Sequence, residues 1–256
     1  MSVIVDFHIH YPEDMQLEAL VRTCENLGVV KVCMLSLGKW RNNVNENILV
    51  EKAMKEYPDL IVGFAYVALG RDPPDIVDEF HSRGFRGIKL IDPAKPYDVD
   101  EFFDYYERME DYNLLALFHT GIVARGARDR EWRVSSEFMR PVRLDRIARV
   151  FPKLRIIGAH LGHPWCDEAA VVMMHNSNVY FDISGGHTFW VALAIRRRGR
   201  YDVDPARLLF GSDAFSPRVI ERMLRFWEVA LPQLGLNKEE VAWVLGKNAL
   251  KLLGST

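Results

Sequence analysis

The sequence opens with Val3-Ile4-Val5-Asp6-Phe7-His8-Ile9-His10, an apolar run that ends in two histidines. Successive side chains of a β-strand point to opposite faces, so Asp6, His8 and His10 are predicted to share one face. At about 3.3 Å of rise per residue, the two imidazoles stand about 7 Å apart at the backbone, close enough to bind one metal ion. A half-buried edge strand is the simpler explanation of a lone His-x-His, so the meaning of this pair depends on the rest of the chain.

Seven further apolar runs follow, and segments with helical periodicity separate them. They cover residues 29–37, 60–67, 87–91, 114–119, 154–160, 179–184 and 208–213. Near-continuous apolar strands are typical of parallel strands that are buried on both faces. Eight of them, alternating with helices, predict a single-domain (β/α)8 TIM barrel over residues 1–256.

The composition argues against several classes of partner. The chain has 256 residues, of which 49% are hydrophobic, and 33 lysines and arginines against 35 acids give a formal net charge of −2. This balance argues against nucleic acid or an anionic membrane as a partner. The start of the sequence has no basic and apolar targeting pattern, and no long uncharged apolar stretch occurs. A soluble, cytoplasmic protein is therefore expected.

Polar side chains collect at or near the carboxyl ends of the predicted strands. They are His10, Lys89, His119, His160, Asp182 and Asp213. In a (β/α)8 barrel this rim carries the active site. Four nitrogen or oxygen donors that converge on one mouth suit Zn²⁺, with Mn²⁺ as an alternative.

These motifs resemble the amidohydrolase superfamily and, within it, the amidohydrolase 2 branch. The similarity runs in order through Asp6-x-His8-x-His10, Gly87-Ile88-Lys89-Leu90, His119-Thr120-Gly121, Ala159-His160-Leu161-Gly162, Phe210-Gly211-Ser212-Asp213 and Asn248-Ala249. The resemblance implies a TIM barrel in which four residues, His8, His10, His119 and Asp213, bind a divalent metal. It does not choose between the hydrolases and the non-oxidative decarboxylases of this branch.

The resemblance also makes His160 either the residue that transfers a proton or a ligand of a second ion. An imidazole beside a metal-activated water favours the first role, with a buried core histidine as the alternative. Asp213 is a second candidate for accepting that proton. In binuclear relatives a lysine at the position of Lys89 is carboxylated and bridges two metal ions. We expect a single ion here, with Lys89 as a charged ammonium group. This cation would pair with Asp182 or Asp213, or it would bind a substrate carboxylate. Asp6 is expected to support the geometry of the ligands.

Two loops mix guanidinium and indole groups. Trp40 and Arg41 follow the second predicted strand, and Arg125, Arg128 and Arg133 follow the fifth. If these loops face the barrel mouth, they can hold a planar anionic substrate through bidentate and stacking contacts. Solvated loops with exposed basic residues are the alternative. His163 and His187 are further candidates for lining the pocket.

Three functions follow as hypotheses. The first is a metal-dependent hydrolase that cleaves a small, carboxylated lactone, ester or amide with metal-activated water, favoured by the prevalence of this chemistry among relatives. The second is a metal-dependent decarboxylase, a lyase, of an unsaturated or aromatic acid. The third is a non-catalytic barrel that binds a metal. The apolar terminal segment, residues 240–253, indicates packing against the barrel end or a homodimer.

Overall fold

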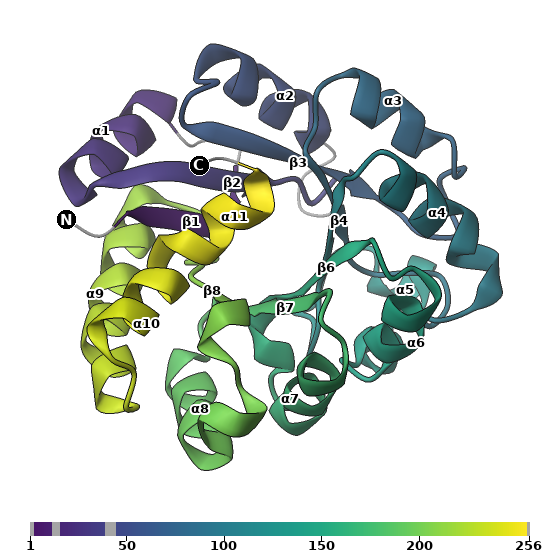
Figure 1. Cartoon of the computed structure of the whole chain (residues 1–256). Helices are drawn as coiled ribbons and strands as arrows, with labels where there is room; N and C mark the ends of the chain where they lie inside the picture. Colours follow the sequence, from purple (N-terminus) through teal and green to yellow (C-terminus); the bar gives the residue numbers. More distant parts are fainter. Residues whose placement is uncertain (1–2, 12–15, 39–44, 255–256) are drawn as a thin grey trace.

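Eight parallel strands hydrogen-bond in chain order and form the barrel of this computed structural model (Figure 1). The structure describes residues 3–11, 16–38 and 45–254, with the backbone alone at residues 198–202. The strands are β1 (Ile4–His10), β2 (Val29–Leu35), β3 (Ile61–Val67), β4 (Gly87–Leu90), β5 (Leu115–Phe118), β6 (Arg155–Gly158), β7 (Val179–Asp182) and β8 (Leu208–Leu209). The predicted (β/α)8 TIM barrel is confirmed.

Helices connect the strands and surround the barrel. They are α1 (Leu17–Leu27), α2 (Glu46–Glu56), α3 (Ile76–Ser82), α4 (Phe103–Asp111), α5 (Asp129–Trp132), α6 (Arg143–Val150), α7 (Cys166–His175), α8 (Thr188–Asp202), α9 (Pro217–Gln233), α10 (Lys238–Ala242) and α11 (Asn248–Leu253). Local signals set several ends: the Asn45 side chain caps the start of α2, and Asn237 and Glu240 form a capping box at α10. Within the described residues, no helix is both long and apolar enough to cross a bilayer.

The segment after β8 closes the barrel against β1. The backbone N–H of Asp213 donates to the carbonyl of His8 at 2.7 Å, and the N–H of His10 donates to the carbonyl of Ala214 at 2.8 Å. Closure of a parallel barrel brings its first and last strands together. Asp213 therefore lies beside the two histidines of β1, although about two hundred positions separate them in the chain.

A β-bulge interrupts the alternation of side chains along β1. Asp6 pairs with Val32 and Ile9 pairs with Met34, so β1 uses one more residue than β2 over this stretch. Both Val32 and Met34 pack in the hydrophobic cluster between the barrel and its helices. Paired residues of neighbouring strands share a face, so Asp6 and Ile9 also face the helices.

The bulge corrects one expectation from the sequence. Phe7 packs inside the barrel, and His8 and His10 also point inward, where they line the cavity at its mouth. Asp6 therefore does not share a face with the two histidines, because the extra residue reverses the alternation between Phe7 and Ile9.

The terminal helices cover the end of the barrel opposite this mouth. A π-helical segment, η5 (Trp243–Lys247), joins α10 to α11, and α11 lies against β1 and β8 (Figure 1). Ala249, Leu252 and Leu253 pack in the same cluster as Val5 and Phe7 inside the barrel. Part of the apolar face of this segment is thus used within the molecule, and the homodimer stays a prediction.

Candidate metal centre

Three donor atoms at the mouth of the barrel have the spacing of metal ligands. His8 Nε2 and His10 Nε2 are 3.2 Å apart, and Asp213 Oδ1 lies 3.1 Å from His10 Nε2 and 3.4 Å from His8 Nε2. Ligands at about 2.0–2.2 Å from one ion, at tetrahedral or octahedral angles, stand about 2.9–3.6 Å from one another. The three atoms therefore fit a single divalent ion.

The second nitrogen of each histidine on β1 is already engaged. His8 Nδ1 lies 2.8 Å from Asp182 Oδ2, and His10 Nδ1 lies 3.0 Å from the carbonyl oxygen of Leu35. Both partners are acceptors, so each Nδ1 carries the proton. Each Nε2 then carries the lone pair and lies on the side of Asp213, the usual arrangement around metal-binding histidines.

His119 supplies a fourth candidate donor. It follows β5, is only 8% exposed, and its buried Nε2 has no hydrogen-bond partner among the described residues. An unpaired buried polar atom is destabilising unless something absent from the protein chain satisfies it. A metal ion in this cavity would satisfy it, so the orphaned nitrogen supports the fit of the donor set to a divalent ion.

The protonation of these groups also suits a cation. Burial and the charge of Lys89 lower the pKa of His8 to about 3, and burial, with His160 and Lys89, lowers the pKa of His119 well below its usual value. Burial alone would raise the pKa of Asp213, but its contact with His10 and the charges of nearby groups outweigh burial and hold it below its usual range. Neutral imidazoles and an ionised carboxylate are the forms that bind metal.

Lys89 places a buried ammonium group beside these donors. Its Nζ lies 3.4 Å from His8 Nε2, and the side chain is 1% exposed. Burial lowers the pKa of Lys89 to about 8, an effect that Asp182 and Asp213 oppose, so the group is mainly charged at pH 7. Lys89 forms no ion pair within the described part of the chain. The direct pairing with Asp182 or Asp213 that was one expectation does not occur, and the cation remains available to a substrate.

His160 is held by a residue that the sequence reasoning missed, Ser184. The Ser184 hydroxyl donates to Asp182 Oδ1 at 2.5 Å, and its oxygen lies 2.8 Å from His160 Nδ1. Because the hydroxyl hydrogen is directed at Asp182, Nδ1–H of His160 is the donor in the second contact. His160 Nε2 is then the nitrogen left for chemistry. The signal for Ser184 in the sequence was its position, two residues after Asp182 at the end of a predicted strand.

The backbone around His160 is shaped for this contact. His160 lies in the turn η3 (Ala159–Gly162) with φ 59°, and its N–H donates to Asp182 Oδ1 at 2.9 Å. A Cβ at Gly185 would come within 3.0 Å of His160 Nδ1, and Gly185 has a φ of +96°. Only glycine accommodates both this close approach and this conformation without strain.

Asp182 connects the proposed metal ligands to His160. One of its oxygens contacts His8 Nδ1, and the other accepts from Ser184 and from the His160 backbone. Burial by itself would raise the pKa of Asp182, but the charge and hydrogen bond of His8, followed by His160 and Ser184, hold it well below its usual value. The carboxylate thus orients both imidazoles at once.

Asp6 supports the site through the backbone. Its Oδ1 accepts from the N–H of His8 at 3.2 Å and from the N–H of Ser212 at 2.9 Å. Burial raises the pKa of Asp6 to about 7, although the hydrogen bonds from Ser212 and His8 oppose this change. Asp6 therefore links the bulge of β1 to the residue before Asp213.

The donors line a cavity of about 110 Å³ at the mouth of the barrel. Its polar members are His8, His10, Lys89, His119, His160 and Asp213, and its other members are Leu37, Ile91, Val123, Ala124 and Phe215. The ring of Phe215 stacks on His10 with 4.7 Å between centroids. Convergent polar groups in an apolar wall are typical of a small-molecule site.

The other candidates that the structure describes on the loops do not line this cavity. His163 and His187 stack on each other, with 4.5 Å between ring centroids, and neither lines it. Arg125 and Arg133 are exposed on the loop after β5, and Arg128 lines a neighbouring cavity. Trp40 and Arg41 lie outside the described residues. The expectation that these groups surround the metal pocket is therefore not met by His163, His187, Arg125, Arg128 or Arg133.

The chain was compared with known families and structures. The amidohydrolase family model, Amidohydro_2, matches residues 39–255. An uncharacterized TIM-barrel protein from Bordetella bronchiseptica is 19% identical, with a TM-score of 0.74 and 98% of each chain covered. 5-Carboxyvanillate decarboxylase LigW from Sphingomonas paucimobilis is 16% identical, with a TM-score of 0.69 and 100% of each chain covered.

A further structure with the same fold contains a metal. It is a 5-carboxyvanillate decarboxylase from Novosphingobium aromaticivorans, complexed with manganese and a nitrobenzoic acid, and it is 14% identical with a TM-score of 0.67. The alignment covers 99% of this chain and 96% of that one. The comparison with curated proteins gave no match. Because the family model spans most of the sequence, the chain belongs to the amidohydrolase family of enzymes.

Proposed function

We propose that this protein is a metal-dependent hydrolase of a small, carboxylated organic molecule with a lactone, ester or amide bond. The observation that carries the proposal is the placement of His160: its Nδ1 is fixed on Ser184, and its free nitrogen accompanies the four candidate metal donors in one cavity. When bound, the divalent ion would lower the pKa of a water molecule towards ~7 and polarise the carbonyl group under attack.

His160 then acts as the base. It accepts at Nε2 the proton lost by the attacking water and returns it to the leaving oxygen or nitrogen of the substrate, while Nδ1–H continues to donate to Ser184, whose hydroxyl donates to the Asp182 carboxylate. The negative charge of Asp182 stabilises the imidazolium that forms. Asp213, which keeps its charge, stays in the donor set and balances the cation.

Lys89 holds the substrate. Its ammonium has no carboxylate partner in the described residues and lines the same cavity as the donors, so a substrate carboxylate is the group that would neutralise it. Leu37, Ile91 and Phe215 provide apolar surface for the organic part of the molecule.

Zn²⁺ is the metal that we propose first. Three imidazoles and one carboxylate are a ligand set that zinc accepts readily. Mn²⁺ is the alternative, supported by the manganese in the related Novosphingobium decarboxylase. Elemental analysis of the purified protein distinguishes the two, and we expect about one ion per chain.

Non-oxidative decarboxylation is the second candidate. It is favoured by the apolar wall around Lys89 and the donors, which would place a carboxylate in a poorly hydrated site, and by the activity named for the two related decarboxylases. In that reaction, His160 would give a proton to the carbon that loses carbon dioxide. The non-catalytic barrel finds no support, because the chain belongs to a family of enzymes.

A substrate screen separates the two reactions. Carboxylated lactones, esters and amides, together with unsaturated and aromatic acids, would be incubated with the metal-loaded protein while acid release and carbon dioxide are both followed. We expect acid release without carbon dioxide. Carbon dioxide with no hydrolytic product would replace the hydrolase with the lyase.

Replacement of His160 by alanine tests the assignment of the base. His160→Ala should keep the metal, since the four donors remain, and should lose about 10²–10⁴-fold in kcat, the usual contribution of general acid–base catalysis. Metal content and kcat would be measured on the same preparation. An unchanged kcat would contradict the role given to His160.

A cytoplasmic location and a homodimer are further proposals from the sequence. Light scattering at micromolar concentration tests the second, and a monomer there would contradict it.

A further inference from the structure

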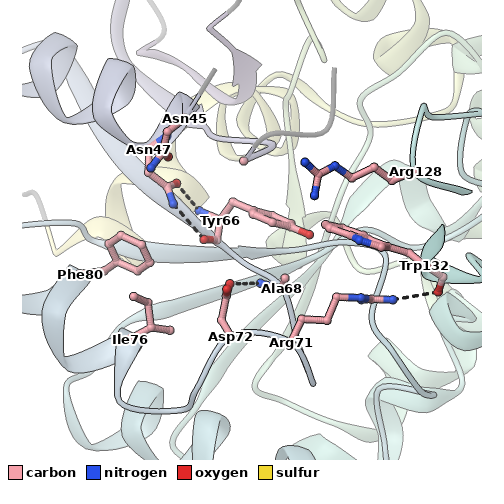
Figure 2. A pocket seen from close by; sticks show the side chains of 11 residues that line it. Asn45, Asn47, Tyr66, Ala68, Arg71, Asp72, Ile76, Phe80, Arg128 and Trp132 are labelled. Carbon is pink, nitrogen blue, oxygen red and sulfur yellow. Dashed lines mark hydrogen bonds between the residues drawn. The ribbon is translucent and has the colours of Figure 1, made fainter. Parts of the chain in front are cut away.

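A second and larger cavity lies beside the metal centre. It encloses about 320 Å³ between β3, α2, α3 and α5, and we call it the arginine cavity after Arg71 and Arg128 in its wall (Figure 2). It shares no lining residue with the metal cavity. The two have a common wall: Tyr66 lines the arginine cavity, and its hydroxyl lies 3.5 Å from the carbonyl of Ile91, which lines the other.

Two guanidinium groups of this cavity gather around one indole. The Cζ atom of Arg71 lies 4.4 Å from the ring centroid of Trp132, and that of Arg128 lies 5.2 Å from it. In the view of Figure 2 the two groups lie on either side of the indole. Both distances are within the range of cation–π attraction. The indole partly offsets the repulsion between the two cations but does not neutralise them.

Arg71 is fixed in place with donors to spare. Its Nη1 donates to the carbonyl of Asp92 at 2.7 Å, and its Nη2 donates to the carbonyl of Trp132 at 2.9 Å. A guanidinium carries five N–H donors, so three of them are not used by these bonds. The Arg128 guanidinium makes no hydrogen bond or ion pair with the described residues, and only its backbone carbonyl accepts, from the N–H of Trp132. The cavity therefore contains preorganised donors without acceptors.

The arginines of the outer helices and loops differ from this pair. Arg83, Arg140 and Arg143 each face a carboxylate, from Glu51, Glu168 and Asp98 respectively. Neither Arg71 nor Arg128 has such a partner in the described part of the chain. Asp72 is the one acid among the described lining residues, and its Oδ2 accepts from the N–H of Ala68 at 2.8 Å. The charge of the lining remains positive.

The Tyr66 side of the cavity is held in place by neighbouring groups. The Asn47 side chain pairs with both backbone groups of Tyr66, accepting at 2.7 Å and donating at 3.1 Å (Figure 2). Gly38 lies against the Tyr66 ring, where a Cβ would come within 2.3 Å of Cδ1. Tyr66 is thus held from two sides. Because Tyr66 is only 7% exposed, the accessible aromatic surface of the cavity is that of the half-buried Trp132 indole.

We infer that the arginine cavity binds a small, planar organic carboxylate at a site separate from the metal centre. The carboxylate would accept from the free donors of Arg128 and Arg71, the bidentate contact that a guanidinium favours. The planar body would lie against Trp132, the accessible aromatic side chain of the described lining. This inference does not rest on the proposed function, because it requires neither a metal nor a reaction.

Titration calorimetry with 2-naphthoate tests the site on the full-length, metal-loaded protein. We expect saturable binding, and we expect Arg128→Gln to weaken it at least tenfold, since a charge-assisted hydrogen bond is lost. Arg125→Gln is the matched control, because Arg125 is exposed on the same loop and does not line the cavity. The neutral 2-naphthamide should bind at least tenfold more weakly than the acid.

The Asp213→Ala variant separates this site from the metal centre. If its circular dichroism spectrum matches that of the parent, it should bind 2-naphthoate as the parent does. Loss of binding in Asp213→Ala, with unchanged binding in Arg128→Gln, would place the acid at the metal centre and overturn the inference. The absence of saturable binding up to millimolar acid would overturn it as well. A second readout is quenching of tryptophan fluorescence, which Trp132→Phe should reduce.

Discussion

The metal centre and the arginine cavity lie next to each other at the same end of the barrel, yet their charges are arranged in opposite ways. In the candidate metal centre, His8 and His10 each have Nδ1 engaged by an acceptor and Nε2 without a proton. The carboxylates of Asp182 and Asp213 lie beside these imidazoles. In the arginine cavity two guanidinium groups are present, and the one carboxylate of the described lining, Asp72, accepts from the backbone N–H of Ala68 and does not pair with them. A group of free lone pairs indicates an absent cation, and a group of free N–H donors indicates an absent anion.

The largest expected effect concerns the donor set. Asp213→Ala and His8→Ala should each reduce metal affinity by more than about 100-fold, because loss of a ligand exceeds the 10–100-fold that loss of a supporting group produces. Elemental analysis after dialysis against a weak chelator measures this. Arg128→Gln is the control and should keep its metal. Full metal occupancy and parental activity in both ligand variants would mean that neither residue binds the metal. The contrast in charge between the two cavities would then no longer hold.

Ser184 provides a sharper test inside the metal centre. Ser184→Ala removes the nearer acceptor for His160 Nδ1–H, the hydroxyl at 2.8 Å, and leaves only the Ser184 carbonyl at 3.3 Å, while all four metal donors remain; we therefore expect metal content to be kept and kcat to fall about 10–100-fold. KM should change much less, because Ser184 does not line the cavity. Ser184→Thr retains a hydroxyl and should recover part of the loss. Equal kcat in Ser184→Ala and the parent would show that His160 needs no such support.

Replacement of Asp6 tests the bulge of β1, which directs His8 towards the proposed metal site. Asp6→Ala leaves the buried N–H groups of His8 and Ser212 without their acceptor, so we expect the free energy of unfolding to fall by about 1–3 kcal/mol. Asp6→Asn keeps an oxygen at this position and should be closer to the parent. Urea unfolding of the metal-free proteins measures the difference. Similar unfolding of all three would mean that the bulge does not depend on Asp6.

The smallest expected effect concerns Arg83, an arginine that is paired with a carboxylate, that of Glu51. Hydrogen bonds from Arg83 and Lys55 lower the pKa of Glu51 to about 2. A carboxyl whose pKa is lower in the folded state adds stability above its unfolded pKa of about 4.5, and this stability is lost as the pH falls towards 2. Glu51→Gln should therefore lower the free energy of unfolding at pH 7 by about 1 kcal/mol or less and should show a flatter acid dependence. Parallel pH profiles of the two proteins would contradict this.

Much of the metal centre could be predicted before the fold was known. His10, His119 and Asp213 stand at or just beyond predicted strand ends, and a parallel barrel brings all such ends to one mouth. The pairing of Ser184 with His160 could not be predicted in this way, because it depends on how the turn after β6 meets the end of β7. The direction of Arg128 was likewise undecided, since a loop carries no periodicity that tells one side from the other.

The apolar periodicity of the sequence by itself determined the strand order, the parallel barrel and the end of it that carries polar groups, because burial of both strand faces leaves few other arrangements. Only the tertiary structure decided the direction of individual side chains. In β1, alternation places Asp6 with His8, but closure against β8 and pairing with β2 introduce one extra residue and separate them. A bulge of this kind depends on partners far away in the chain, and a local pattern contains no information about them.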